Sequence, residues 1–130
     1  FPPQPGKILV MDADEMVRDI TRHVLERAGL KVTCAKNATD AVKSYRNAME
    51  AEYPFRVVIL DLMTNDNEMT GVSTLEQLKK LNPDVQAIVS SGYPSDPIIK
   101  QYKQYGFHAS ISKPYTPKDL LNIINQFSPL

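Results

Sequence analysis

The stretch Val57-Val58-Ile59-Leu60-Asp61 decides the fold class of this 130-residue chain. Its apolar residues follow one another without a polar interruption, which is typical of a strand that is covered on both faces. Such a strand belongs inside a parallel sheet, and Asp61 then stands at the edge where the carboxyl ends of the strands meet. The stretch therefore predicts an α/β fold with a candidate site at Asp61.

Apolar runs and helical patterns alternate on both sides of this strand. The predicted strands cover residues 7–11, 30–35, 56–60, 85–89 and 107–111. Between them apolar residues recur at helical spacing, in the stripes Val17, Ile20, Val24, Leu25 and Ala28; Ala38, Ala41, Val42 and Tyr45; Val72, Leu75, Leu78 and Leu81; Ile98, Ile99, Tyr102 and Tyr105; and Leu120, Leu121, Ile123 and Ile124. This alternation requires parallel strands and right-handed crossovers. We therefore predict a doubly wound, five-stranded parallel sheet.

Residues that begin or end helices stand beside several stripes. Asn37 and Thr116 are candidate N-caps, and Pro117 fits the first position of the last helix. Gly29 and Gly106 stand where a left-handed residue would end a helix. These residues support the predicted helix boundaries.

The composition excludes several classes of protein. Lys plus Arg and Asp plus Glu are balanced at 15 each, so the net charge gives no footprint for nucleic acid or an anionic membrane. Cys34 is the only cysteine, which rules out an internal disulfide and a multi-cysteine zinc site, and we expect it to be a small buried hydrophobe. No apolar stretch approaches the roughly 20 residues that span a bilayer. We expect a cytoplasmic domain without direct nucleic-acid or membrane contact.

The first residues differ in composition from the rest. Phe1-Pro2-Pro3-Gln4-Pro5-Gly6 is typical of a linker, and the first residue is Phe rather than Met. We expect residues 1–6 to be a linker and residues 7–130 to be one domain, which has been cut from a longer protein.

Polar residues with related chemistry follow the predicted strands. Asp12 and Asp14 follow the first strand, Asp61 the third, Ser90 the fourth and Lys113 the fifth. A carboxylate can accept a phosphoryl group when its charge and the phosphate's charge are neutralised together. Mg²⁺ takes oxygen ligands, usually one or two carboxylates with phosphate and water. The set therefore indicates phosphoryl chemistry, with Asp61 as the best candidate nucleophile.

Over residues 7 to 127 the chain resembles the receiver domains of response regulators in two-component systems. The resemblance rests on Ile8-Leu9-Val10-Met11-Asp12, Val58-Ile59-Leu60-Asp61-Leu62, Ala87-Ile88-Val89-Ser90-Ser91-Gly92-Tyr93 and Lys113-Pro114-Tyr115. It implies a flavodoxin-like (βα)5 fold with strand order 2-1-3-4-5. Residues 87–107 look most like receivers of sensor hybrid histidine kinases, so the expected parent chain is such a kinase. The domain itself is expected to be a phosphoacceptor rather than a turnover enzyme.

The resemblance also implies a role for each candidate residue. Asp61 would accept the phosphoryl group from a histidine kinase or a histidine phosphotransfer domain, and the domain would then change shape. Lys113, aimed by a cis peptide bond to Pro114, would contact a phosphoryl oxygen. Ser90 would be the switch hydroxyl that binds the phosphoryl group. Mg²⁺ would be the cofactor.

The implied Mg²⁺ ligands are Asp12, Asp61 and the backbone carbonyl of Met63, with Asp14 as a further candidate. Receivers usually carry a second acid directly after the first, and here Ala13 takes that place. Two other positions depart from the family. Ser110 replaces the usual aromatic switch residue, and the polar loop from Leu62 to Thr70 is longer than usual, lacks the usual proline and adds Asp66 and Glu68.

Two other functions fit part of the pattern. A degenerate receiver, which is never phosphorylated and only binds a protein partner, would explain Ala13. Asp12-Ala13-Asp14 also resembles the Asp-x-Asp signature of haloacid-dehalogenase-type phosphatases, in which the first Asp is the nucleophile. Against the phosphatase, Met16 stands where Thr or Val is preferred, and no acidic pair follows Lys113.

Overall fold

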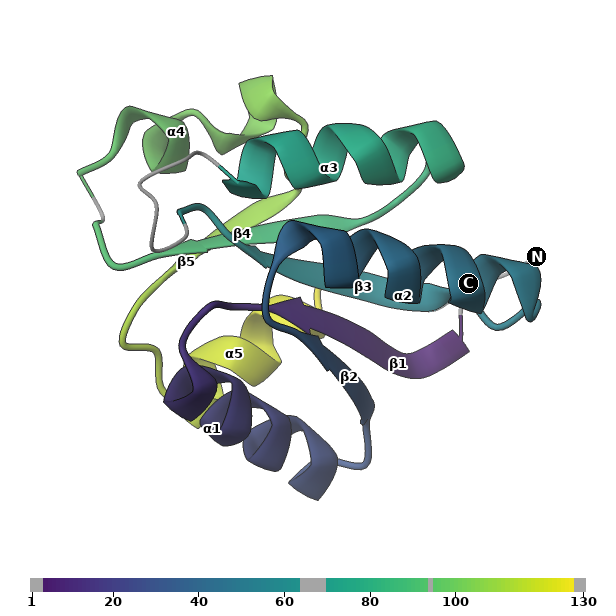
Figure 1. Cartoon of the computed structure of the whole chain (residues 1–130). Helices are drawn as coiled ribbons and strands as arrows, with labels where there is room; N and C mark the ends of the chain where they lie inside the picture. The colour runs from purple at the N-terminus through teal and green to yellow at the C-terminus, as the bar shows by residue number, and fades with distance from the viewer. Residues whose placement is uncertain (1–3, 64–69, 94, 128–130) are drawn as a thin grey trace.

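The computed structural model describes residues 4–63, 70–93 and 95–127. Its strands are β1 (Gln4–Met11), β2 (Lys31–Ala35), β3 (Phe55–Asp61), β4 (Ala87–Ser91) and β5 (Ala109–Ser112). Its helices are α1 (Glu15–Arg27), α2 (Ala38–Glu50), α3 (Thr70–Leu81), α4 (Pro97–Lys100) and α5 (Pro117–Ile124), with a 3₁₀ helix, η1 (Tyr102–Tyr105), after α4. The strands are parallel in the order β2-β1-β3-β4-β5, which confirms the predicted sheet (Figure 1).

Helices cover both faces of this sheet. The helices α1 and α5 lie on one face, while α2 and α3 lie on the other (Figure 1). Every residue of β3 is buried. Because side chains alternate along a strand, Val57 and Ile59 join the core under α5, whereas Val58 and Leu60 join the core under α2 and α3. This two-sided burial explains the unbroken apolar run that the sequence shows there.

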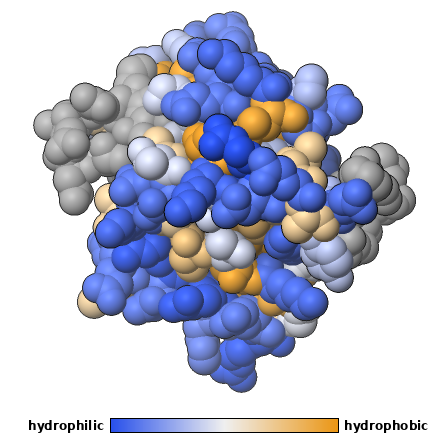
Figure 2. Space-filling model, turned by 45° about the vertical axis from the view of Figure 1, so that its right-hand side comes forward, coloured by the Kyte–Doolittle hydropathy of each residue, from blue (hydrophilic) through white to orange (hydrophobic). Residues whose placement is uncertain are grey.

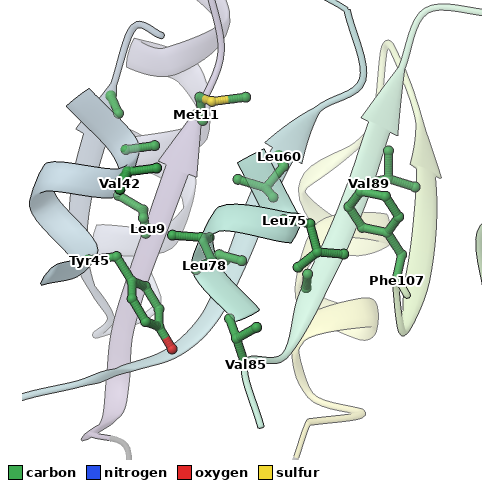
Figure 3. Packing of buried hydrophobic residues seen from close by; sticks show 14 of the residues in the cluster. Leu9, Met11, Val42, Tyr45, Leu60, Leu75, Leu78, Val85, Val89 and Phe107 are labelled. Atoms are coloured by element: carbon green, nitrogen blue, oxygen red, sulfur yellow. The ribbon is translucent and has the colours of Figure 1, made fainter. Parts of the chain in front are cut away.

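The core under α2 and α3 is the larger of the two (Figure 3). Tyr45 of α2 is 1% exposed, and its ring stacks on Phe55 with the centroids 6.0 Å apart. Its hydroxyl accepts a hydrogen bond from Asn82 Nδ2 at 3.0 Å, so the polar end of this buried side chain is satisfied. The candidate site lies at the edge of the sheet where β1 and β3 end.

The predicted helix boundaries are confirmed at several ends. At the start of α2, the Asn37 side chain accepts a hydrogen bond from the Asp40 N–H at 2.8 Å. At the start of α5, Thr116 and Asp119 form a capping box, and Pro117 is the first residue of the helix. Gly29 and Gly106 have φ values of 89° and 93°, a region that glycine enters without the steric penalty of a Cβ. Local sequence therefore fixes where these helices begin or end.

The first strand begins earlier than predicted. β1 starts at Gln4, which pairs with Phe55, and the register then shifts before Ile8. The backbone of residues 4–6, which we predicted to be linker, therefore continues β1. The assignment of residues 7–130 to one domain stays a prediction.

Two helices differ from the predicted stripes. In α1, Leu25 is buried as predicted, but Ile20 is 58% exposed and Thr21, which is 1% exposed, takes its place on the buried face. The predicted fourth helix is split at Gln101, whose φ and ψ of −116° and 34° are not helical, and Tyr105 is left exposed. The spacing of apolar residues alone predicts neither the exposure of Ile20 nor the break at Gln101.

The face of the molecule in Figure 2 is mostly hydrophilic, with small hydrophobic patches.

Cys34 is half-buried rather than fully buried as predicted, with its Sγ 4.0 Å from the Arg18 carbonyl oxygen. Within the described ranges, no helix combines the length and the apolar character that crossing a membrane requires.

Candidate functional site

The ends of β1, β3 and β5 bring two carboxylates and one ammonium group together. Lys113 Nζ lies 2.6 Å from Asp12 Oδ2 and 3.2 Å from Asp61 Oδ1. Asp12 and Asp61 are only 2% and 7% exposed. Two negative charges and one positive charge leave the group with a net charge of −1. A buried group with this charge is suited to receive a further cation.

Three hydrogen bonds hold Asp12, and their partners lie in β2, in the loop after β1 and in α1. Its backbone N–H donates to the Ala35 carbonyl at the end of β2 at 3.0 Å. Its Oδ1 accepts from the Asp14 N–H at 2.9 Å, and its own carbonyl accepts from Arg18 Nη1 at 2.7 Å. The carboxylate is therefore fixed in orientation, with Oδ2 directed to Lys113.

Asp61 is the last residue of β3, and α3 begins against its backbone. The Leu62 N–H donates to the Ser90 carbonyl at 2.8 Å, which continues the β3–β4 ladder. A Cβ at Gly71, in the first turn of α3, would lie 2.7 Å from the Asp61 carbonyl oxygen. Glycine is therefore required where α3 approaches the candidate acceptor.

Lys113 leaves the sheet directly after β5. Its N–H donates to the Ser91 carbonyl at 2.8 Å, and its peptide bond to Pro114 is cis, which confirms that prediction. Ser90 is 2% exposed and lies opposite Asp61 in the β3–β4 register. The structure thus brings Asp12, Asp61, Ser90 and Lys113 to one edge of the sheet.

The electrostatics of the site follow from burial and close charge. Burial, together with the charge of Asp12, raises the pKa of Asp61 to about 6, although Lys113 and a hydrogen bond with the Met63 backbone act in the opposite direction. Burial lowers the pKa of Lys113, but its hydrogen bond to Asp12 and the charges of Asp61 and Asp12 outweigh burial and raise it. At neutral pH Asp61 is thus largely ionised and Lys113 is charged.

Asp14 is separated from this group. It is the exposed N-cap of α1, and its Oδ1 accepts from the Met16 N–H at 2.9 Å. Asp66 and Glu68, the acids that the sequence places near the site, lie outside the described residues. Ser110 stands half-buried on β5 at the position where the family has an aromatic residue.

The donors at this edge fit Mg²⁺, which binds oxygen and usually takes one or two carboxylates with water. Asp12 and Asp61 offer two buried carboxylates, and Lys113 supplies only one positive charge between them. Among the residues that the structure describes, no group of three or more His, Cys, Asp and Glu side chains could hold a metal ion. The fit therefore depends on two acids and on backbone oxygen, without help from Ala13.

The sequence did not single out two residues of α1 that hold the segments around the site. Arg18 donates to the Asp12 carbonyl, and Thr21 shares a hydrogen bond with Tyr115, two residues after Lys113. Both are polar residues in a helix, and nothing in the spacing of α1 distinguishes them from solvent-facing ones. Only the position of α1 against the sheet edge reveals them.

Comparison with known proteins gives one matching family. The model of the family described as response regulator receiver domain matches residues 8–125, which is nearly the whole chain.

Individual relatives point the same way. A putative NtrX-like response regulator from Rickettsia bellii is 29% identical over 92% of this chain and 24% of its own length. The hydrogenase transcriptional regulatory protein HoxA from Bradyrhizobium diazoefficiens is 32% identical over 93% of this chain and 24% of its own length. The chain thus spans about a quarter of these relatives. A CheY-like receiver domain protein from Methanospirillum hungatei has a crystal structure that superposes with a TM-score of 0.80, at 30% identity and over 95% of this chain and 93% of that one.

Proposed function

This chain belongs to the response regulator receiver domain family, and from that premise we propose that Asp61 is its phosphoacceptor. The observation that carries the proposal is the buried contact of Lys113 with both Asp61 and Asp12, at 3.2 Å and 2.6 Å. Asp61 ends the central strand, where a phosphoryl donor can reach the sheet edge. Its pKa of about 6 leaves it largely ionised at neutral pH, as a nucleophile must be.

Receiver domains are phosphorylated by histidine kinases or histidine phosphotransfer proteins. In the proposed reaction, an Asp61 carboxylate oxygen attacks the phosphorus of a phosphohistidine. A P–O bond forms to Asp61, the P–N bond breaks, and the electron pair stays on the imidazole nitrogen, which takes up a proton. Lys113, already beside Asp61 Oδ1, would stabilise the negative charge of the phosphoryl oxygens.

The proposed cofactor is Mg²⁺, which receiver domains generally require and which would supply the positive charge that Lys113 alone does not. The residues proposed to hold it are Asp12, Asp61 and the backbone carbonyl of Met63. Asp14 is the weakest candidate, because its carboxylate caps α1. Ser90, opposite Asp61 on β4, is proposed to donate its hydroxyl hydrogen to the phosphoryl group.

The finer assignments stay predictions. The parent protein was predicted to be a hybrid histidine kinase, whereas the relatives described above are named as regulators. The cytoplasmic location and the lack of direct nucleic-acid and membrane contact also stay predictions. Labelling by a purified phosphorylated histidine phosphotransfer domain, compared with labelling by a purified histidine kinase, would identify the class of donor.

A degenerate receiver is the second candidate, and Ala13 is the observation that favours it. A single experiment separates the candidates: incubation with acetyl phosphate and Mg²⁺, followed by intact-protein mass spectrometry. We expect a mass gain of one phosphoryl group, its loss in Asp61→Asn and its reduction in Asp12→Asn. Persistent labelling of Asp61→Asn would rule out Asp61 as the acceptor.

The other outcomes identify the alternatives. If the wild-type protein gains no phosphoryl group at any Mg²⁺ concentration and hydrolyses no phosphomonoester, the degenerate receiver is correct. The phosphatase alternative predicts turnover of a phosphomonoester that Asp12→Asn abolishes and Asp61→Asn spares.

A further inference from the structure

The α1 helix forms hydrogen bonds to the segment that carries Asp12 and to the segment that carries Lys113, the two partners of the ion pair. Arg18 Nη1 donates to the Asp12 carbonyl at 2.7 Å. The Thr21 hydroxyl shares a 2.6 Å hydrogen bond with the phenolic hydroxyl of Tyr115. Because residues three apart lie on the same face of a helix, Arg18 and Thr21 reach the sheet edge together. One face of α1 therefore contacts the loop of Asp12 and the loop of Lys113.

The Thr21–Tyr115 contact is short and partly buried. Thr21 is 1% exposed, although it is polar and lies in the middle of a helix. The distance of 2.6 Å is at the short end for two hydroxyl groups. Burial is the main cause that raises the pKa of Tyr115, so its hydroxyl stays protonated and able to bond at neutral pH. Loss of the Tyr115 hydroxyl would leave the buried Thr21 hydroxyl without this partner, which costs free energy.

Tyr115 is an anchor close to Lys113. On the other side, the Lys113 N–H is held by the Ser91 carbonyl at 2.8 Å. Pro114, between the two anchors, is exposed. The position of the Lys113 backbone is therefore set by the ladder to β4 and by the tether from Tyr115 to α1.

Packing and one hydrogen bond together hold this loop. The Tyr115 ring packs against the core under α5. A cavity of about 270 Å³ lies between part of α1 and the loop, and its lining includes Val17, Ile20 and Pro114 as well as Lys113 and the hydroxyl pair. The hydrogen bond from Tyr115 to Thr21 is the directional contact between α1 and the loop.

We propose that Thr21 and Tyr115 are positioning residues that hold the Lys113 ammonium group between Asp12 and Asp61. The inference rests on the proposed function, since the position of Lys113 affects phosphorylation only if Asp61 is the acceptor. Neither residue touches the carboxylates in this role. Each acts through the backbone of Lys113.

The first test observes Lys113 directly, in the metal-free and unphosphorylated protein. NMR of its ε-methylene and ammonium groups should change in Tyr115→Phe and in Thr21→Val, each of which removes one hydroxyl and keeps the side-chain shape. The double variant should resemble either single variant, because both break the same bond. Thr21→Ser, which keeps the hydroxyl, should restore the wild-type signals.

The second test measures the rate of labelling by acetyl phosphate at saturating Mg²⁺. Tyr115→Phe and Thr21→Val should each slow labelling by about five-fold, the factor that corresponds to about 1 kcal/mol for one hydrogen bond. Tyr45→Phe is the matched control, because Tyr45 also loses one partly buried hydrogen bond, to Asn82, far from Lys113. It should lose stability but keep the wild-type rate.

The outcomes separate the two proposals. Unchanged Lys113 signals in Tyr115→Phe, or equal slowing in Tyr45→Phe, would show that the hydroxyl pair serves only stability and would overturn the inference. Absence of labelling in the wild-type protein would overturn the proposed function instead. In that case the Lys113 signals of the same variants still decide whether the pair positions the lysine.

Discussion

Asp61 is held in a place that disfavours its own charge. Its carboxylate is buried beside Asp12, and Lys113 lies closer to Asp12 than to Asp61. These surroundings raise its pKa from 3.8 to about 6, so the native state binds a proton more tightly than the unfolded state does. Ionisation of Asp61 therefore destabilises the metal-free fold at neutral pH. A cation bound beside Asp61 would offset this destabilisation.

Asp61→Asn should accordingly stabilise the metal-free domain at pH 7. We expect the free energy of unfolding to rise by on the order of 1–3 kcal/mol, since one pKa unit corresponds to about 1.4 kcal/mol. The gain should shrink as the pH falls through about 6 towards 4, because wild-type Asp61 then becomes protonated and neutral. Urea unfolding of both proteins at pH 7 and pH 5 measures the difference. A gain of the same size at both pH values would contradict this explanation.

Asp12→Asn is the matched control for that experiment. It removes the partner that lies 2.6 Å from Lys113 and accepts from the Asp14 N–H, so it should destabilise the domain at pH 7. If Asp61→Asn stabilises the domain and Asp12→Asn destabilises it, Asp12 contributes through its ion pair with Lys113, whereas Asp61 contributes the excess negative charge.

Lys113→Ala should raise the pKa of Asp61 above about 6, because the ammonium group favours the ionised carboxylate. The contact is worth on the order of a few kcal/mol at the effective dielectric of a partly screened site. A pH titration of the Asp61 carboxyl carbon by NMR measures the shift, and Lys113→Arg controls for charge. In Lys113→Ala we expect acetyl phosphate to label the protein at a reduced rate, and we expect phosphorylation no longer to cause a conformational change. A conformational change as large as that of the wild-type protein would show that Lys113 has no part in it.

At the scale of the elements, α3 depends on one glycine. A methyl group at position 71 would lie 2.7 Å from the Asp61 carbonyl oxygen and 2.9 Å from the Leu62 Cα, and both are backbone atoms that cannot turn aside. Gly71→Ala should therefore lower the free energy of unfolding by about 1–3 kcal/mol, the usual effect of overpacking. Gly92→Ala is the control, because a Cβ there meets nothing within 4 Å. Equal effects in thermal unfolding would exclude the close approach as the cause.

The sequence predicted the elements better than their faces. Continuous apolar runs and caps such as Asn37 and Thr116 are local signals, and the strands and most helix ends lie close to where these signals put them. The face of α1 depends instead on how the helix sits on the sheet, so Thr21 is buried where Ile20 was expected. The split after α4 likewise depends on the backbone at Gln101, which apolar spacing does not encode.

The site shows the same division. Asp12, Asp61 and Ser90 could be predicted because each directly follows an apolar run, and Lys113 because it stands two residues after the last predicted strand. Their contacts could not, because the meeting of Asp12, Asp61 and Lys113 depends on a strand order that the resemblance supplied. The bond between Thr21 and Tyr115 joins residues 94 positions apart and had no signal in the sequence.

At the scale of the whole molecule, the question is how strongly Mg²⁺ binding is coupled to folding. A ligand that binds only the native state stabilises it in proportion to the logarithm of its concentration over the dissociation constant. In the proposed site two acids and backbone oxygen would form the donor set, since Ala13 has no side-chain oxygen and Asp14 caps α1. The whole domain should therefore gain less stability from Mg²⁺ than a variant with a third carboxylate at position 13.

The variant Ala13→Asp tests this in both directions. Without metal, a third acid beside two buried carboxylates should lower the free energy of unfolding, because like charges repel. With Mg²⁺ the order should reverse. We expect affinity about ten-fold or more above that of the wild-type protein, and each ten-fold adds about 1.4 kcal/mol of stabilisation when Mg²⁺ exceeds both dissociation constants. Thermal unfolding across a Mg²⁺ titration, with Ca²⁺-free buffer and a chelated reference, measures both effects.

Asp14→Ala, run in parallel, decides how a negative result is understood. Loss of this N-cap should lower stability by about 1 kcal/mol, because the Met16 N–H loses its acceptor. It should leave the dependence on Mg²⁺ unchanged if Asp14 is only a cap. If Ala13→Asp binds no more tightly and Asp14→Ala binds more weakly, Asp14 already supplies the missing carboxylate. If neither variant alters the response to Mg²⁺ and the wild-type protein shows none, the domain holds no metal, and phosphorylation of Asp61 would have to depend on Lys113 alone.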